Sequence, residues 1–105
     1  MAQLYITELA EADIAGVLSH TLERWGAAQY ARYGELIELA LADLAANPGC
    51  GGLRSEIRPG LRAHHIKRPG RNARHILFYR VERDEHVVVL RLLHDHMDFA
   101  RHLPE

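Results

Sequence analysis

Two stretches in the second half of the chain, residues 73–81 and 86–93, are rich in aliphatic, β-branched and aromatic residues, as strands are. The charged link between them, residues 82–85, is short and suits the loop of a β-hairpin. Alternation with a period of two places His75 and Tyr79 on the same face of the first stretch. Because neither face is fully polar, we expect two central strands, with one face on the core and the other partly covered or used for binding.

Helical periodicity dominates the first half of the chain. Apolar residues recur at helical spacing over residues 14–25, and Thr7 precedes this stripe as a good N-cap. A second helix is predicted over residues 27–46, where two adjacent apolar stripes indicate that more than one side is buried. The run Asn47-Pro48-Gly49 ends it. Because only Gly26 separates the two helices, we expect an antiparallel helical hairpin.

Three shorter elements complete the predicted fold: strands at residues 3–6 and 61–67, and a short tail helix near residues 97–102. Segregated helices and consecutive strands favour the α+β class, in the order β-α-α-β-β-β. We expect an N-terminal strand, then an antiparallel two-helix hairpin packed on a mainly antiparallel sheet of about four strands, and a short C-terminal helix or tail. Residues 1–105 are predicted to be a single domain, because this length suffices for one modest core.

Composition narrows the class of protein. No basic region precedes an apolar run at the N-terminus, so no secretory signal is predicted, and no apolar run approaches the ~20 residues of a membrane span. The single cysteine, Cys50, excludes an intrachain disulfide framework and fits a reducing cytoplasm. It lies in a Gly-rich segment with no nearby histidine or acid to activate it, so we interpret it as an incidental loop thiol. We expect a cytoplasmic protein without a cofactor.

The net charge of −1 is distributed unevenly along the chain. Residues 54–80 carry eight basic side chains and one acidic one, whereas residues 1–53 and 81–105 are both acidic overall. Such a basic block suits phosphate groups or an acidic protein partner. The alternative is that these arginines only decorate solvated strand faces and loops.

Several short motifs follow one another in a specific order, although each alone is common. They are Glu11-Ala12-Asp13-Ile14, Glu23-Arg24-Trp25-Gly26, Ala28 with Tyr30, Leu44 with Asn47-Pro48, Ile57 to Arg62, Ile76 to Val81, Leu92-Leu93-His94, Met97-Asp98 and His102-Leu103. In this order and spacing they resemble the RelE/ParE toxin superfamily, and most closely its ParE branch, over nearly the whole chain. The resemblance implies a small bacterial toxin of a type II toxin–antitoxin system, neutralised by a ParD-like antitoxin.

The resemblance leaves the target open between two activities. ParE-like toxins are associated with inhibition of DNA gyrase, whereas RelE-like relatives cleave mRNA on the ribosome. Cleavage of RNA needs a general base, a general acid and cations. Two arginine positions of RelE fall on His75 and near Asp95 here, so the resemblance favours a non-enzymatic gyrase inhibitor. The alternative, a ribosome-dependent endoribonuclease of the RelE type, would use His75, Tyr79, Arg80 and His94. A toxin that has lost its activity is a third possibility.

The resemblance also implies two binding surfaces. The antitoxin-binding residues would be Trp25, Tyr30, Tyr33, Leu36, Arg58 and Arg62. Alternatively, the four of these residues that lie in the predicted helical hairpin are simply part of the hydrophobic core. The target-binding residues would be Arg74, Arg80, His94, Met97, Asp98 and His102. We expect a hetero-oligomer with the antitoxin, a heterotetramer or larger, and direct nucleic-acid binding only in the nuclease alternative.

The histidines near the C-terminus also invite a metal interpretation. His94 and His96 would share a strand face if the strand continues, and Asp98 or His102 would add a ligand. No cysteine partner or known ligand spacing supports such a site, so no metal is predicted. In a structural interpretation, Asp98 caps the tail helix and Met97 anchors that helix to the core.

Overall fold

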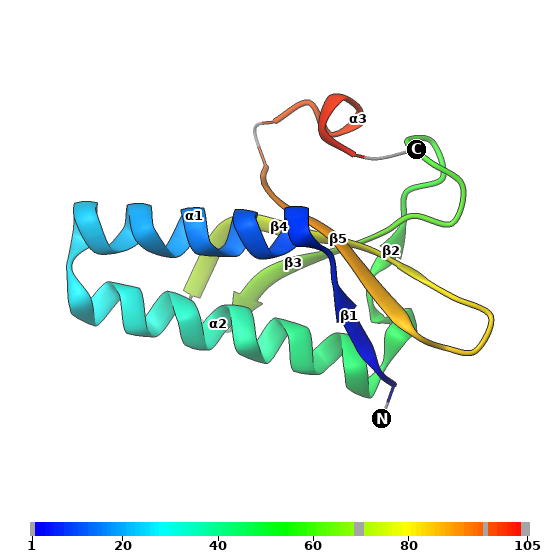
Figure 1. Ribbon diagram of the computed structural model, residues 1–105, viewed down its shortest axis with the longest axis horizontal. Coiled ribbons are helices and arrows are strands. Elements are labelled where there is room, and N and C mark those ends of the chain that lie inside the picture. Colours follow the sequence, from blue (N-terminus) through cyan, green and yellow to red (C-terminus); the bar gives the residue numbers. More distant parts are fainter. Residues whose placement is uncertain (1, 69–70, 96, 104–105) are drawn as a thin grey trace.

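The computed structural model describes residues 2–68, 71–95 and 97–103. Figure 1 shows two long antiparallel helices lying along a twisted sheet, with a short third helix beyond it. The elements are β1 (Leu4–Ile6), α1 (Glu8–Trp25), α2 (Ala27–Ala46), a 3₁₀ turn (Pro48–Cys50), β2 (Gly52–Leu53), β3 (Arg62–Arg68), β4 (Arg71–Val81), β5 (Val87–His94) and α3 (Phe99–His102). Within the described ranges, no helix is long and apolar enough to cross a bilayer.

The strand order in the sheet is β1-β5-β4-β3-β2. β1 runs parallel to β5, with Leu4 opposite Val87, and the other pairs are antiparallel. The predicted α+β class, the helical hairpin and the central position of β4 and β5 are confirmed. The sheet has one strand more than expected, because the two residues of β2 pair with β3, and no strand was predicted between the second helix and residue 61. The position of β1 beside β5 was not predictable from the strand's sequence.

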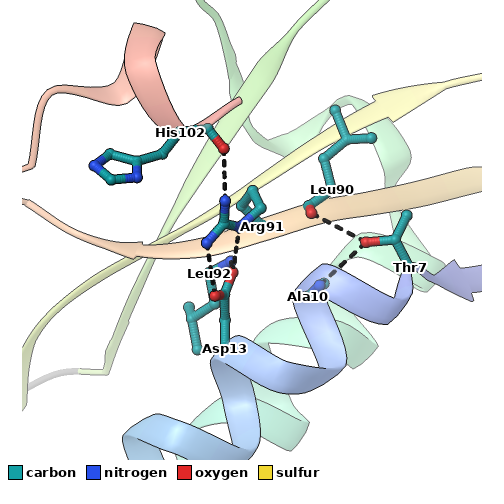
Figure 2. Close-up of polar contacts among 7 residues, drawn as sticks. All are labelled: Thr7, Ala10, Asp13, Leu90, Arg91, Leu92 and His102. Atoms are coloured by element: carbon teal, nitrogen blue, oxygen red, sulfur yellow. Dashed lines mark hydrogen bonds and ion pairs between the residues drawn. The ribbon is translucent and has the colours of Figure 1, made fainter. Parts of the chain in front are cut away.

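The ends of the helices follow from local chemistry. Thr7 accepts a hydrogen bond from the Ala10 N–H through its hydroxyl oxygen (3.1 Å), as an N-cap does. The same hydroxyl donates to the Leu90 carbonyl (3.0 Å), which ties the start of α1 to β5 (Figure 2). Gly26 ends α1 and redirects the chain into α2. Its φ of +87° would be strained for a residue with a side chain, and glycine adopts it readily.

The two faces of the central strands enter two different cores. On the side of α1 and α2, Leu77 and Tyr79 of β4 are fully buried with residues of the helical hairpin. On the opposite side, Ile76 and Phe78 pack beneath the C-terminal segment, where the Phe99 ring lies 4.7 Å from that of Phe78. Both faces of β4 are therefore covered, and polar groups gather at its ends.

The aromatic and apolar residues of the helical hairpin divide between core and surface. Leu36 is 7% exposed and belongs to the first core, and Tyr33 packs half-buried against it. In contrast, Trp25 is 67% and Tyr30 41% exposed. Trp25 continues the predicted apolar stripe of α1 but leaves the core, because the turn between α1 and α2 projects beyond the sheet (Figure 1).

A mostly buried ion pair joins α1 to β5 (Figure 2). The Asp13 carboxylate accepts hydrogen bonds from Nε (2.6 Å) and Nη2 (2.8 Å) of Arg91 and from the Leu92 N–H (3.0 Å). Arg91 also donates through Nη1 to the carbonyl of His102 (2.7 Å), which holds the C-terminal segment to the same strand. The hydrogen bonds to Asp13 raise the pKa of Arg91 further above its ordinary value.

We expect Asp13→Ala to lower the free energy of unfolding by about 3 kcal/mol, because the Arg91 guanidinium would stay mostly buried without its partner. Chemical denaturation followed by circular dichroism measures this loss. Glu82→Ala is the matched control, since it breaks the exposed pair between Arg80 and Glu82 and should cost less than about 1 kcal/mol. Equal losses in the two variants would contradict the role of the buried pair.

Candidate functional site

The residues that a nuclease would use are split between two ends of the sheet. His75 and His94 lie opposite each other on β4 and β5, with ring centroids 5.2 Å apart and ring planes at 86°. Tyr79 lies four residues farther along β4, which corresponds to about 13 Å. Arg80 is at the same far end and pairs with Glu82 (2.7 Å). Of the four residues named for the nuclease alternative, only His75 and His94 lie together, because Tyr79 is on the same face of β4 but toward its other end.

Tyr79 has a structural role at its end of the strand. Its hydroxyl donates to the Pro48 carbonyl (2.7 Å) and accepts from the Gly51 N–H (2.8 Å), and its side chain is fully buried. It thereby fixes the 3₁₀ turn against the sheet. Gly51 must be glycine for this contact, because a Cβ would lie 2.6 Å from the Tyr79 hydroxyl oxygen.

Tyr33 of α2 completes the histidine pair instead. Its hydroxyl hydrogen-bonds to Nδ1 of His75, and the two rings lie 5.6 Å apart. Burial raises the pKa of Tyr33 to about 12. Burial also lowers the pKa of His75; nearby His94 adds to that effect and Asp95 opposes it. At neutral pH, Nδ1 of a neutral His75 therefore accepts a hydrogen bond from the neutral Tyr33 hydroxyl.

Two adjoining hollows open beside these side chains, and we call them together the histidine cleft. The inner hollow, of about 370 Å³, lies between α1 and the end of β5 and is mostly apolar, with Gly16, Leu93 and Met97 on its walls. The outer hollow, of about 530 Å³, lies between the end of the helical hairpin and the start of β4. Its additional lining residues include Arg24, Trp25, Gln29, Tyr33 and Arg74. The residues shared by both hollows are His20, Thr21, His75 and His94.

The remaining predicted target-binding residues lie around the C-terminal segment. Met97 lines the inner hollow and packs against the second core, which agrees with its predicted anchoring role. Asp98 occupies the N-cap position of α3, but its side chain makes no capping hydrogen bond. The prediction that its carboxylate caps the helix is therefore wrong; the backbone carbonyl of Asp98 instead accepts from the Arg101 N–H (3.2 Å). His102 contributes its carbonyl to Arg91.

The two predicted antitoxin-binding arginines, Arg58 and Arg62, both donate hydrogen bonds to backbone carbonyls of their own chain. Arg58 donates to the carbonyls of Ile57 (2.8 Å) and Ala100 (3.1 Å). Arg62 donates to the carbonyl of Gly51 (2.7 Å). Part of the basic block therefore stabilises loops at the end of the sheet away from the histidine cleft.

The exposed aromatic residues of the helical hairpin face two different hollows. Trp25 lines the outer hollow of the histidine cleft, whereas Tyr30 lines a separate hollow of about 520 Å³ along α1. We call the latter the α1 groove, and its lining residues are Glu11, Ile14, Ala15, Leu18, Ser19, Leu22 and Tyr30. Leu36, which is buried in the core, lines none of these hollows.

Cys50 has neighbours that its sequence context did not reveal. Its Sγ lies 3.9 Å from Nδ1 of His64, and Nε2 of His64 lies 3.3 Å from a carboxylate oxygen of Asp43. The prediction that no histidine or acid lies near Cys50 is wrong, because the 3₁₀ turn, α2 and β3 meet at this point. The thiol itself is exposed.

No group of three or more His, Cys, Asp or Glu side chains is placed to hold a metal ion in residues 2–68, 71–95 and 97–103. His96, one of the ligands considered from the sequence, lies outside these described residues. His94, the other, has its Nδ1 3.2 Å from a carboxylate oxygen of Asp95. This contact is an ordinary one for a histidine at the end of a strand.

Comparisons with known proteins agree on one family. A family model described as "ParE toxin of type II toxin-antitoxin system, parDE" matches residues 4–99. Toxin ParE of Escherichia coli is 34% identical over 105 residues, covering 100% of this chain and 96% of that protein. Toxin ParE1 of Mycobacterium tuberculosis is 35% identical over 98 residues, covering 93% of this chain and 94% of that protein.

The fold has a counterpart among solved structures. A chain of the structure titled "Chromosomal ParDE TA system from P. aeruginosa" superposes with a TM-score of 0.73 at 21% identity. The match covers 90% of this chain and 96% of that one. The two chains therefore share the arrangement of helical hairpin and sheet. At 21% sequence identity this likeness shows a common fold only.

We expect His75 to give the stability of the protein a specific dependence on pH. Because folding lowers the pKa of His75, the unfolded chain takes up a proton at this residue below about pH 6.5, whereas the folded chain takes it up only at a lower pH. Stability is therefore lost as pH falls below that value. Thermal unfolding between pH 7 and 5 should show a smaller loss for His75→Gln than for the wild type. Tyr33→Phe retains His75, so its stability should fall with pH as steeply as that of the wild type. If the stability of His75→Gln fell just as steeply, His75 would not be the source of the pH dependence.

We expect Gly16→Ala to raise the free energy of unfolding by about 1 kcal/mol, because Gly lowers helix stability by this amount and the added Cβ meets nothing within 4 Å. The added methyl group would point into open space because Gly16 lines the inner hollow. Gly51→Ala is the contrasting variant, whose methyl group would clash with Tyr79 and should destabilise the protein. Urea denaturation of both variants gives the two changes, and a destabilised Gly16→Ala would show that the hollow is not open at this position.

Proposed function

The chain belongs to the ParE toxin family of type II toxin–antitoxin systems, and on that premise we propose that it binds and inhibits DNA gyrase. A ParD-like antitoxin neutralises it in a hetero-oligomer, a heterotetramer or larger. In this proposal the toxin acts in the cytoplasm as a binding inhibitor and needs no cofactor.

The observation that carries this proposal is the dispersal of the residues that a RelE-type nuclease would use. Tyr79 is buried and engaged by the turn at Pro48 and Gly51. Arg80 is paired with Glu82 at the far end of β4 from His75 and His94. A mechanism that needs these four groups around one phosphodiester has no support in this geometry, whereas inhibition by binding does not require it.

The target-binding surface in this proposal surrounds the histidine cleft. Arg74 and His94 line its outer hollow, and Met97 lines its inner hollow. Asp98 and His102 lie on the adjoining C-terminal segment, while Arg80 is remote from it. We therefore centre the proposed gyrase contact on Arg74, His94 and Met97.

The antitoxin has a separate surface in this proposal. The α1 groove is mostly apolar, and Tyr30 and Leu22 are exposed along it. An amphipathic helix of an antitoxin would place its apolar face there, with Tyr30 as an anchor. A segment that is disordered when free and folds on binding fits this role, because it can be degraded to release the toxin.

One observation favours the second candidate, a ribosome-dependent endoribonuclease. His75 and His94 face each other at 5.2 Å, and Arg24 and Arg74 line the same hollow. Two imidazoles beside cationic groups are able to act as general base and general acid on a phosphodiester. The assay of the proposed function therefore includes mRNA as a second readout.

We expect purified, antitoxin-free toxin to stop DNA supercoiling by gyrase and to leave mRNA intact in a translation extract. Arg74→Gln should raise the concentration for half-inhibition about tenfold, equivalent to roughly 1.4 kcal/mol, because it removes a charged contact at the proposed interface. Arg83→Gln makes the same change of charge in the exposed β4–β5 turn and should have no effect. Unaffected gyrase at large molar excess, together with mRNA cleavage that His94→Ala abolishes, would establish the nuclease instead.

A further inference from the structure

The outer hollow of the histidine cleft has an unusual set of side chains for a protein of net charge −1. Two arginines and three histidines line it, and none of its described lining residues is acidic. Asp95, which directly follows β5, lies beside this set: its N–H donates to the Arg74 carbonyl (2.8 Å) and its carboxylate lies 3.2 Å from Nδ1 of His94. Donors of hydrogen bonds to an anion therefore converge on the hollow from α1, β4 and β5.

The strands deliver more basic residues to the same end of the sheet. β3 ends on Lys67 and Arg68, and β4 begins at Arg71, three residues before Arg74. The middle of the basic block is thus at the end of the sheet that borders the outer hollow. Arg62, in contrast, lies opposite Tyr79 in the register, toward the other end.

An aromatic side chain stands at the same hollow. Trp25 is 67% exposed, and the guanidinium of Arg24 lies 5.9 Å from the centre of its ring, within cation–π range. Tyr33 lines the hollow more deeply, held by its hydrogen bond to His75. An exposed indole beside a cationic hollow offers a stacking surface next to a phosphate site, the combination that single-stranded nucleic acids use.

A protein segment explains these features less well. The surface suited to an amphipathic helix, the α1 groove, lies elsewhere and contains an acidic residue, Glu11. An acidic peptide would pair with Arg24 and Arg74 but would not need a flat aromatic face at the rim. The volume of the outer hollow, about 530 Å³, also accommodates a nucleotide unit.

We propose that the outer hollow binds single-stranded DNA, with Arg24 and Arg74 contacting a phosphate and a base stacking on Trp25. This inference rests on the proposed function, because gyrase acts on DNA and a toxin bound to it would lie close to that DNA. It revises the expectation that direct contact with nucleic acid belongs only to the nuclease alternative. The toxin then grips both the enzyme and its DNA.

The test uses the antitoxin-free toxin and a short fluorescent oligothymidylate, without gyrase, and measures anisotropy between about 50 and 200 mM salt. Binding should weaken with salt, with a slope of log K against log salt near −0.7 for each phosphate contact. Arg74→Gln should weaken binding and reduce the slope by about 0.7. Trp25→Ala should weaken binding about tenfold with no change of slope. Arg83→Gln should match the wild type.

Three outcomes would overturn the proposal. The first is no binding at the lowest salt, and the second is equal weakening by Arg74→Gln and Arg83→Gln, which indicates attraction by overall charge. The third is tighter binding of oligouridylate or of polyglutamate than of oligothymidylate. Circular dichroism confirms that each variant is folded. Because gyrase is absent, failure of this test leaves gyrase inhibition standing, and failure of the supercoiling assay leaves the DNA contact standing.

Discussion

The ion pair between Asp13 and Arg91 sets the relative positions of three parts of the molecule. It joins α1 to β5, and through the carbonyl of His102 it holds the C-terminal segment to the same strand. These three parts are also walls of the inner hollow, to which Asp13, Arg91 and Met97 all contribute. A charge pair out of water tolerates few geometries, because each donor and acceptor must be satisfied. The ion pair therefore holds together three walls of the inner hollow.

The two cores impose a second constraint on where function can lie. Residues 76 to 79 of β4 are buried alternately toward the helical hairpin and toward the C-terminal segment. Because both faces of β4 pack against a core, its polar side chains can reach solvent or a partner only beyond the edges of these cores. Arg74 and His75 lie at one such end, and Arg80 lies at the other. This separation, rather than the chemistry of any one residue, divides the predicted nuclease set.

The sequence was most informative where the cause of structure is local. Thr7, Gly26 and Asn47 bound the two helices because capping and positive φ act within a few residues. It was least informative where side chains from distant segments meet. Neither the contact of Tyr33 with His75 nor the approach of His64 to Cys50 leaves a signal in spacing. Trp25 shows a further limit: periodicity predicts which side of a helix is apolar but not where the sheet beneath it stops.

Helix α1 serves both proposed surfaces, and its geometry separates them. Successive residues of a helix are rotated by 100°, so positions two apart lie on nearly opposite sides. Ile14, Leu18 and Leu22 line the α1 groove, whereas Gly16, His20 and Arg24 line the histidine cleft. A partner confined to the groove would therefore leave the cleft open. In the proposed complex, the antitoxin must continue past the exposed Trp25 at the end of the hairpin to cover both. A long segment that folds as it binds can make this turn, whereas a rigid domain of similar area would cover one side only.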